Sequence, residues 1–130
     1  MRLKNVMSRR VKCVRPVERL ENASKKMGLN GIHHLVVMDR GKVRGLLTES
    51  VLRTRIAEGV ARVEDAMVRH IAIGTPETSI SQAARMMRGR PEGALVVFDG
   101  KRLAGIVTIS DLLDVLGRCI KDRERPRRAK

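Results

Sequence analysis

The segment best suited to chemistry is GIVTISD, residues 105–111, in which Thr108, Ser110 and Asp111 follow an apolar run. The run is typical of a strand and a helix is predicted to begin near Ser110, so both hydroxyls and the carboxylate lie at a helix start. Backbone amides at a helix N-terminus favour anions, and an acidic side chain there can accept two hydrogen bonds from a ribose diol. The same residues also suit simple capping of the helix. The segment alone is therefore compatible with a ligand site or with a cap.

The chain repeats itself with a constant offset of 60 residues, so that residues 3–58 align with residues 63–118 without a gap. Thirteen aligned pairs are identical: Met7/Met67, Arg9/Arg69, Pro16/Pro76, Ala23/Ala83, Met27/Met87, Leu35/Leu95, Val36/Val96, Val37/Val97, Asp39/Asp99, Gly45/Gly105, Thr48/Thr108, Ser50/Ser110 and Leu52/Leu112. Two copies suit two half-modules that bury their apolar faces against each other. Such an arrangement creates a pseudo-symmetric cleft, which favours a binding module over an enzyme.

The remaining reactive side chains form no catalytic set. Cys13 and Cys119 share no CxxC spacing and lie in apolar patterns, so both are interpreted as small buried hydrophobes in a reducing compartment. The three histidines, His33, His34 and His70, lack the spacing of metal ligands. No nucleophile, acid and base are grouped. We therefore expect neither an enzyme nor a metal site.

Hydrophobic periodicity predicts the order strand, helix, strand, strand, helix in each copy. In the first copy the predicted elements are strand 11–14, a helix from 20, strands 35–38 and 43–47, and a helix 50–58 capped by Ser50. In the second copy they are strand 71–73, a helix capped by Ser79 with Gln82, strands 94–98 and 103–107, and a last helix capped by Ser110. These elements predict an α+β fold of two pseudo-symmetric βαββα repeats packed through their sheets. The repeats are placed at residues 1–60 and 61–119, and residues 120–130 are predicted to be a basic, disordered tail.

The net charge of +14 and the 42% hydrophobic content suit one compact domain with a strongly basic surface. No apolar run approaches the length of a membrane span and no secretory leader is visible, so we expect a cytoplasmic protein without membrane contact. The charge attracts any polyanion. Nucleic-acid binding is therefore the main alternative function, although Phe98 is the only aromatic residue and no helix-turn-helix or zinc-finger pattern is present.

Several motifs recur in order along both copies. They are Val6-Met7 and Ala66-Met67, Pro16 and Pro76, GIHHLVVMD at residues 31–39, GLLT at residues 45–48, and GIVTISD at residues 105–111. With these motifs the chain resembles a pair of CBS domains, the tandem unit often called a Bateman module, over about residues 1–119. The repeat is visible without this resemblance, which adds the fold and the class of ligand.

The resemblance implies a regulatory sensor that binds an adenine nucleotide (AMP, ADP or ATP) or S-adenosylmethionine in the clefts between the repeats, with no catalytic cofactor. Asp111 matches the ribose-binding carboxylate, and Thr108 and Ser110, which flank Ile109, match hydroxyl positions near the ribose and phosphate. The other matching positions are Thr75, Gly74 and Ile73 along the base, Gly93 and Ala94 on the opposite wall, and His33 or His34 at a phosphate. Adjacent strand residues point to opposite faces, so at most one of the two histidines is expected to face the cleft.

Two departures from the family pattern qualify this implication. Val51 stands at the position of Asp111 in the first copy, so the site there is expected to be weaker, empty or adapted to another ligand. Val36 and Val96 stand where the family has proline, which concerns strand geometry more than the ligand. The basic field favours phosphorylated ligands over an adenosyl sulfonium.

The last predicted helix is apolar over more than one narrow stripe, with Leu112, Leu113, Val115, Leu116, Cys119 and Ile120 on its apolar side. This face suits either the intramolecular core or a helix shared with another subunit, and a small module of two copies has few other places to bury it. We therefore expect a homodimer, and members of the resembled family commonly form disc-like dimers packed through their helices. With no effector domain fused, we expect the module to act in trans on a target protein.

Overall fold

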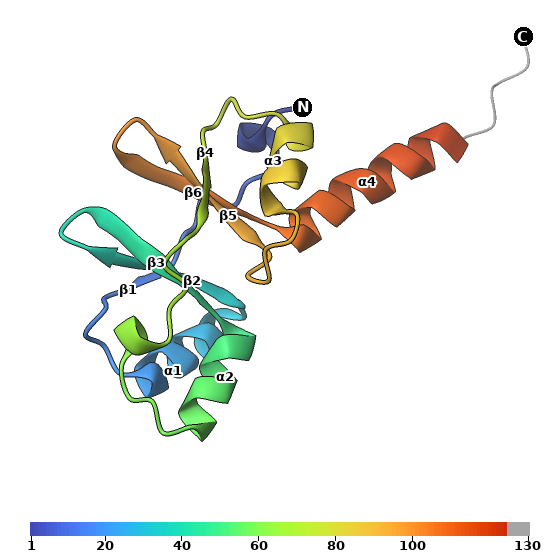
Figure 1. Cartoon of the computed structure of the whole chain (residues 1–130). Helices are drawn as coiled ribbons and strands as arrows, with labels where there is room; N and C mark the ends of the chain where they lie inside the picture. Colours follow the sequence, from blue (N-terminus) through green and yellow to red (C-terminus); the bar gives the residue numbers. More distant parts are fainter. Residues whose placement is uncertain (125–130) are drawn as a thin grey trace, which may run out of the picture.

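The computed structural model describes residues 1–124, and its elements follow the βαββα order in both repeats (Figure 1). The first repeat contains β1 (Cys13–Val14), α1 (Leu20–Asn30), β2 (His34–Asp39), β3 (Lys42–Thr48) and α2 (Glu49–Ala57). The second contains β4 (Ala72–Gly74), α3 (Ile80–Met87), β5 (Ala94–Asp99), β6 (Arg102–Thr108) and α4 (Ile109–Glu124). Short 3-10 helices, η1 (Leu3–Asn5) and η2 (Val63–Asp65), precede the two repeats. The predicted fold class is confirmed.

Each repeat has its own three-stranded sheet, in the orders β1-β2-β3 and β4-β5-β6. The first strand runs parallel to the second, and the second and third form an antiparallel hairpin. Both hairpins carry an irregularity at the equivalent place, after Val37 in one and after Val97 in the other. Paired residues in the two sheets are therefore related by the same 60-residue offset as the sequence.

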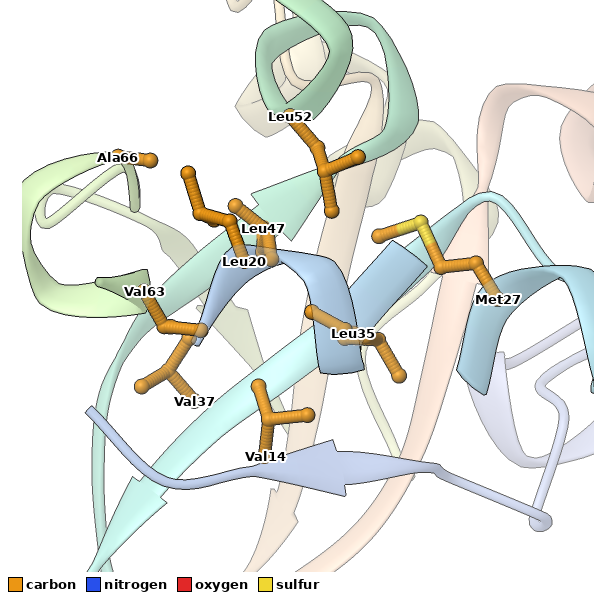
Figure 2. Packing of buried hydrophobic residues seen from close by; sticks show 10 residues of the cluster. Val14, Leu20, Met27, Leu35, Val37, Leu47, Leu52, Val63 and Ala66 are labelled. Carbon is orange, nitrogen blue, oxygen red and sulfur yellow. The ribbon is translucent and has the colours of Figure 1, made fainter. Parts of the chain in front are cut away.

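The core is divided into three layers because side chains alternate along each strand. Leu35 and Val37 point toward the helices of the first repeat, where they pack with Leu20 and Leu52 (Figure 2). Val36, between them in sequence, points the other way and packs with residues of both repeats: Leu46, Ala94 and Val96. The two sheets therefore pack against each other, as predicted, and the helices cover their outer faces.

The lead segment of each repeat packs on the other repeat. Leu3 is fully buried in the core of the second repeat, and its backbone N–H donates to the carbonyl of Thr78 at 2.9 Å. Val63 is fully buried in the core of the first repeat, and its N–H donates to the carbonyl of Glu18 at 2.9 Å. The predicted ranges 1–60 and 61–119 describe repeats in sequence, whereas in space the two units exchange their first residues.

The helix starts differ from the prediction by two residues. Thr48, not Ser50, caps α2, since its Oγ1 accepts from the N–H of Val51 at 3.3 Å. The predicted cap at Ser110 is wrong for the same reason: Thr108 precedes α4, and its Oγ1 accepts from the N–H of Asp111 at 3.4 Å. Each threonine ends a strand, so the helix can begin directly after it without a connecting loop. The predicted cap at Ser79 is confirmed by its 3.1 Å bond from the N–H of Gln82.

The last helix is longer than predicted. α4 continues to Glu124, so the predicted disordered tail is wrong for residues 120–124, which are helical. The remainder of that prediction, residues 125–130, lies outside the described residues. Over residues 1–124, no helix combines the length and the apolar character needed to cross a bilayer.

Candidate functional site in the cleft between the repeats

The start of α4 faces the first repeat across a hollow of about 260 Å³, which we call the Asp111 cleft. Its lining comes from both repeats: Ser8, Arg10, Val11, Lys12, Gly31, Ile32, His33, His34, Ile106, Thr108, Ser110 and Asp111. The segment before β1 and the entry to β2 form one wall. The end of β6 and the first turn of α4 form the other. The cleft therefore exists only because the two sheets are packed together.

The carboxylate of Asp111 is held in place by the residue that ends β6. The N–H of Thr108 donates to Asp111 Oδ2 at 2.8 Å, and the Thr108 hydroxyl lies 3.2 Å from the same oxygen. The N–H of Asp111 returns a bond to the Thr108 hydroxyl. This reciprocal arrangement is a capping box. Asp111 can therefore cap α4 and also face the cleft, because the hydrogen bonds that it accepts from Thr108 use only its Oδ2.

His33 and His34 both line the Asp111 cleft, so the expectation that at most one of them faces it is wrong. The reason is that β2 begins at His34 and His33 lies before it, where strand alternation does not apply. His34 Nε2 lies 2.8 Å from the carbonyl oxygen of Glu92 and so links the two repeats. His33 Nδ1 pairs with Glu49, and this bond, together with nearby Arg53, lowers the pKa of the Glu49 carboxyl.

The predicted base wall at Ile73, Gly74 and Thr75 lies elsewhere. β4 runs parallel to β5, so that Ala72 pairs with Leu95 and Gly74 pairs with Val97. Thr108 pairs with Ala94, at the opposite end of β5. The chain therefore moves away from the Asp111 cleft as it approaches Thr75, whose N–H donates to Thr78 Oγ1 at 2.9 Å. None of the three residues lines the cleft.

Gly93, Ala94 and Ile109 adjoin the site through the backbone without lining it. Ala94 is buried between the sheets, paired in register with Thr108. The Gly93 carbonyl accepts from the N–H of Ile109 at 3.0 Å, which fixes where α4 starts. The side chain of Ile109 instead lines an apolar groove between α3 and α4. Of the eleven predicted positions, five line the cleft: His33, His34, Thr108, Ser110 and Asp111.

The wall formed by the segment from Ser8 to Lys12 is not among the positions predicted from the sequence. Ser8 forms a two-way backbone bridge with Ile106, with N–H to carbonyl distances of 2.9 and 3.0 Å. The exchanged lead segment therefore crosses β6 and then runs along the mouth of the cleft. The repeat alignment was the available signal, but it does not say which copy supplies the wall opposite a given helix start.

A second hollow of about 360 Å³, the Glu92 cleft, lies at the start of α2. It is lined by His33, His34, Thr48, Glu49, Ser50, Arg53, Pro91 and Glu92. The Glu92 side chain is only 3% exposed and lies 3.4 Å from an Arg90 guanidinium nitrogen. Val51, the counterpart of Asp111, does not line it. This cleft therefore lacks a carboxylate at the position equivalent to Asp111, although Glu49 opens α2, and it carries the Glu92 carboxylate on the opposite wall.

Among residues 1–124 no three or more His, Cys, Asp or Glu side chains gather in a way that could hold a metal ion. The two cysteines are free thiols: Cys13 is half-buried, and burial raises its pKa. Cys119 is exposed on α4.

Curated relatives share the repeat over most of its length. A CBS domain-containing protein of Dictyostelium discoideum is 32% identical over 130 residues, covering 88% of this chain and 90% of the relative. YhcV, a CBS domain-containing protein of Bacillus subtilis, is 25% identical over 114 residues, covering 85% of this chain and 81% of the relative. The chain spans only 24% of L-aspartate semialdehyde sulfurtransferase of Methanosarcina acetivorans, to which it is 29% identical over 119 residues.

Solved structures show the same fold. The CBS domain pair of protein MJ0100, in complex with 5′-methylthioadenosine and S-adenosyl-L-methionine, superposes with a TM-score of 0.85 at 22% identity, covering 92% of this chain and 98% of that one. CBSX2 in complex with AMP gives a TM-score of 0.78 at 19% identity, covering 92% and 98%. The sequence model of the CBS domain matches twice, at residues 3–58 and 63–118. The chain therefore belongs to the CBS domain family and carries two such domains in tandem.

Proposed function

We propose that this chain is a regulatory module that binds an adenine nucleotide or a related adenosyl ligand in the Asp111 cleft and transmits the binding to a protein partner. The observation that carries the proposal is the Asp111 carboxylate, held by Thr108 at the start of α4 on a wall of the cleft. The ligands of the MJ0100 domain pair and of CBSX2 support the adenosyl class. The chain covers only about a quarter of the enzyme that it matches, which supports a regulatory rather than a catalytic role.

Each part of an adenosine ligand has a suitable surface in the cleft. The ribose diol donates to the Asp111 oxygen that the cap does not use. The apolar side chains of Val11, Ile32 and Ile106 accept the faces of the base, in place of an aromatic platform. The Ser110 hydroxyl lies in the first turn of α4, where the positive end of the helix dipole favours an anionic group.

Isothermal titration calorimetry with AMP, ADP, ATP and S-adenosylmethionine tests the proposal on wild type and on Asp111→Asn. Asparagine keeps an acceptor for the Thr108 N–H but cannot accept both ribose hydroxyls, so the helix cap survives while the ligand bonds do not. Losing hydrogen bonds to a charged group costs about 1.5–3 kcal/mol, or about tenfold to a hundredfold in dissociation constant. Asp114→Asn is the matched control, because Asp114 is exposed on the same helix.

Saturable binding of an adenosyl ligand that weakens in Asp111→Asn and not in Asp114→Asn is the expected result. Equal binding of nucleotides, inorganic phosphate and RNA, with a steep salt dependence and no effect of Asp111→Asn, contradicts the proposal. That outcome assigns the binding to the basic surface, as in nucleic-acid binding by a CBS scaffold.

The module is further proposed to be a homodimer. Leu113, Leu116 and Ile120 on α4 are 59%, 53% and 46% exposed. They continue an apolar groove of about 540 Å³ between α3 and α4. An apolar face of this kind on a highly charged protein suits a contact with a second copy.

A further inference from the structure

We propose that the Asp111 cleft selects a phosphorylated adenosine over uncharged or cationic adenosyl ligands, and that Arg10 and Lys12 make this selection. The inference rests on the proposed function and narrows its ligand class. The two classes differ at one end of the ligand: a nucleotide carries phosphate anions, whereas S-adenosylmethionine carries a sulfonium cation. The charges around the cleft therefore decide between them.

Arg10 and Lys12 are cations on the cleft wall without an internal partner. Both are exposed, and neither side chain forms an ion pair or hydrogen bond with any residue from 1 to 124. Asp111 is the one carboxylate in the lining. The cleft therefore has two cations and one anion beside the positive end of the α4 dipole, a set that attracts phosphate and repels a sulfonium.

The wall that carries the two cations is fixed at both ends. Before it, Ser8 is bonded to Ile106 of β6 through two backbone hydrogen bonds. After it, the carbonyl of Lys12 accepts from the N–H of Val36 at 3.1 Å, and Cys13 pairs with Val36 in the sheet. Because the segment is bonded at both ends, its backbone is restrained before an anion binds, and most of the freedom lost on binding is that of the Arg10 and Lys12 side chains. A side chain of the same charge on a mobile loop would lose more conformational freedom, because its backbone would have to be ordered as well.

The equivalent positions in the second repeat indicate that Arg10 and Lys12 are a feature of the Asp111 cleft and not of the fold that both repeats share. The 60-residue offset places His70 at the position of Arg10 and Ala72 at that of Lys12. It also places Glu92, a buried carboxylate, at the position of Ile32. The equivalent positions of the second repeat therefore carry neither cation and add the carboxylate of Glu92. The Glu92 cleft is lined by the carboxylates of Glu49 and Glu92, and its one arginine, Arg53, pairs with Glu49, so it is less suited to a phosphorylated ligand.

The test compares AMP, ADP, ATP, adenosine and S-adenosylmethionine on the full chain, by calorimetry at low and at physiological salt. The variant R10Q/K12Q removes both cations. The control R44Q/K42Q removes the same charge from β3, where both side chains are exposed and neither lines the Asp111 cleft. Thermal unfolding of each variant verifies that it is folded.

Wild type is expected to bind at least one nucleotide about tenfold or more tightly than adenosine, and adenosine more tightly than S-adenosylmethionine. R10Q/K12Q should lose about tenfold in nucleotide affinity with adenosine affinity unchanged, and R44Q/K42Q should match wild type.

Three outcomes overturn the inference and are distinguishable. If S-adenosylmethionine or adenosine binds as tightly as the nucleotides and Asp111→Asn abolishes that binding, the selection is wrong while the proposed function stands. If nucleotide affinity falls equally in R10Q/K12Q and R44Q/K42Q, the effect is that of net charge and the assignment to Arg10 and Lys12 is wrong. If no adenosyl compound binds wild type, both the inference and the proposed function fail.

Discussion

At the scale of single residues, Gly105 shows that a motif position repeated in both copies can serve the fold rather than a ligand. A Cβ at Gly105 would lie 2.8 Å from the carbonyl oxygen of Ser8 and 2.8 Å from Met7 Sδ. That carbonyl accepts the Ile106 N–H, so the exchanged lead segment passes directly over the glycine. The close approach that glycine permits here is made by the chain's own backbone.

We therefore predict that Gly105→Ala destabilises the protein by about 1–3 kcal/mol, the usual cost of overpacking. It should also weaken ligand binding, because the displaced segment leads into Arg10 and Lys12 on the cleft wall. Urea denaturation measures the stability and calorimetry measures the binding.

Gly117→Ala is the matched control for this prediction. Gly117 lies within α4 and a Cβ there meets nothing within 4 Å. Alanine in place of a helical glycine is expected to stabilise by up to about 1 kcal/mol. Opposite signs for the two variants support the close approach at Gly105, and a neutral Gly105→Ala contradicts it.

At the scale of elements, the exchange of lead segments makes residue 3 part of the core of the second repeat. Leu3 is fully buried, and it packs with residues of β4, α3 and β5. Leu3→Ala is predicted to cost about 2–5 kcal/mol, since it removes buried methyl groups and leaves a cavity. Chemical denaturation of the full chain measures this cost.

Leu29 provides the comparison, since it is 87% exposed on α1. Leu29→Ala should change the free energy of unfolding by no more than about 0.5 kcal/mol. If Leu3→Ala lowered the free energy of unfolding as little as Leu29→Ala, the lead segment would not be part of the core of the second repeat.

The elements also explain which parts of the site could be predicted. The apolar pattern of Leu35, Val36 and Val37 identified a buried strand, and the offset identified its counterpart in the second copy. A pattern reports that a residue such as Leu3 or Val63 is buried, but not which repeat buries it. The base wall at Ile73, Gly74 and Thr75 came from the resemblance to the family, and the residue pattern offered no check on where that segment lies relative to Asp111.

The helix starts were shifted for a related local reason. Thr48 and Ser50 are both good caps, and the sequence favours neither. What decides between them is the length of β3, which continues to Thr48 because that residue pairs with His34. Likewise, the loss of Asp111's carboxylate at Val51 was visible in the sequence. The carboxylate of Glu92 on the facing wall required the packing of the two repeats.

At the scale of the whole molecule, the apolar face of α4 and the net charge of +14 have opposite effects on the association of two copies. A contact between two copies through this face would bury Leu113, Leu116 and Ile120, and the hydrophobic effect would favour it. The like charge of the two copies disfavours it, and salt screens that repulsion. The dimer should therefore become tighter as salt is raised, whereas binding to a nucleic acid becomes weaker.

We predict that wild type sediments as a dimer and that Leu113→Glu with Leu116→Glu converts it to a folded monomer. Both leucines are more than half exposed in the single chain, so the charged side chains cost little until a partner buries them. Leu29→Glu, at an exposed position on α1, should remain dimeric. Sedimentation velocity over a range of protein and salt concentrations measures all three. A wild-type monomer at every concentration, or a doubly substituted variant that still dimerises, would show that α4 is not the dimer interface, and its apolar face would then need another occupant.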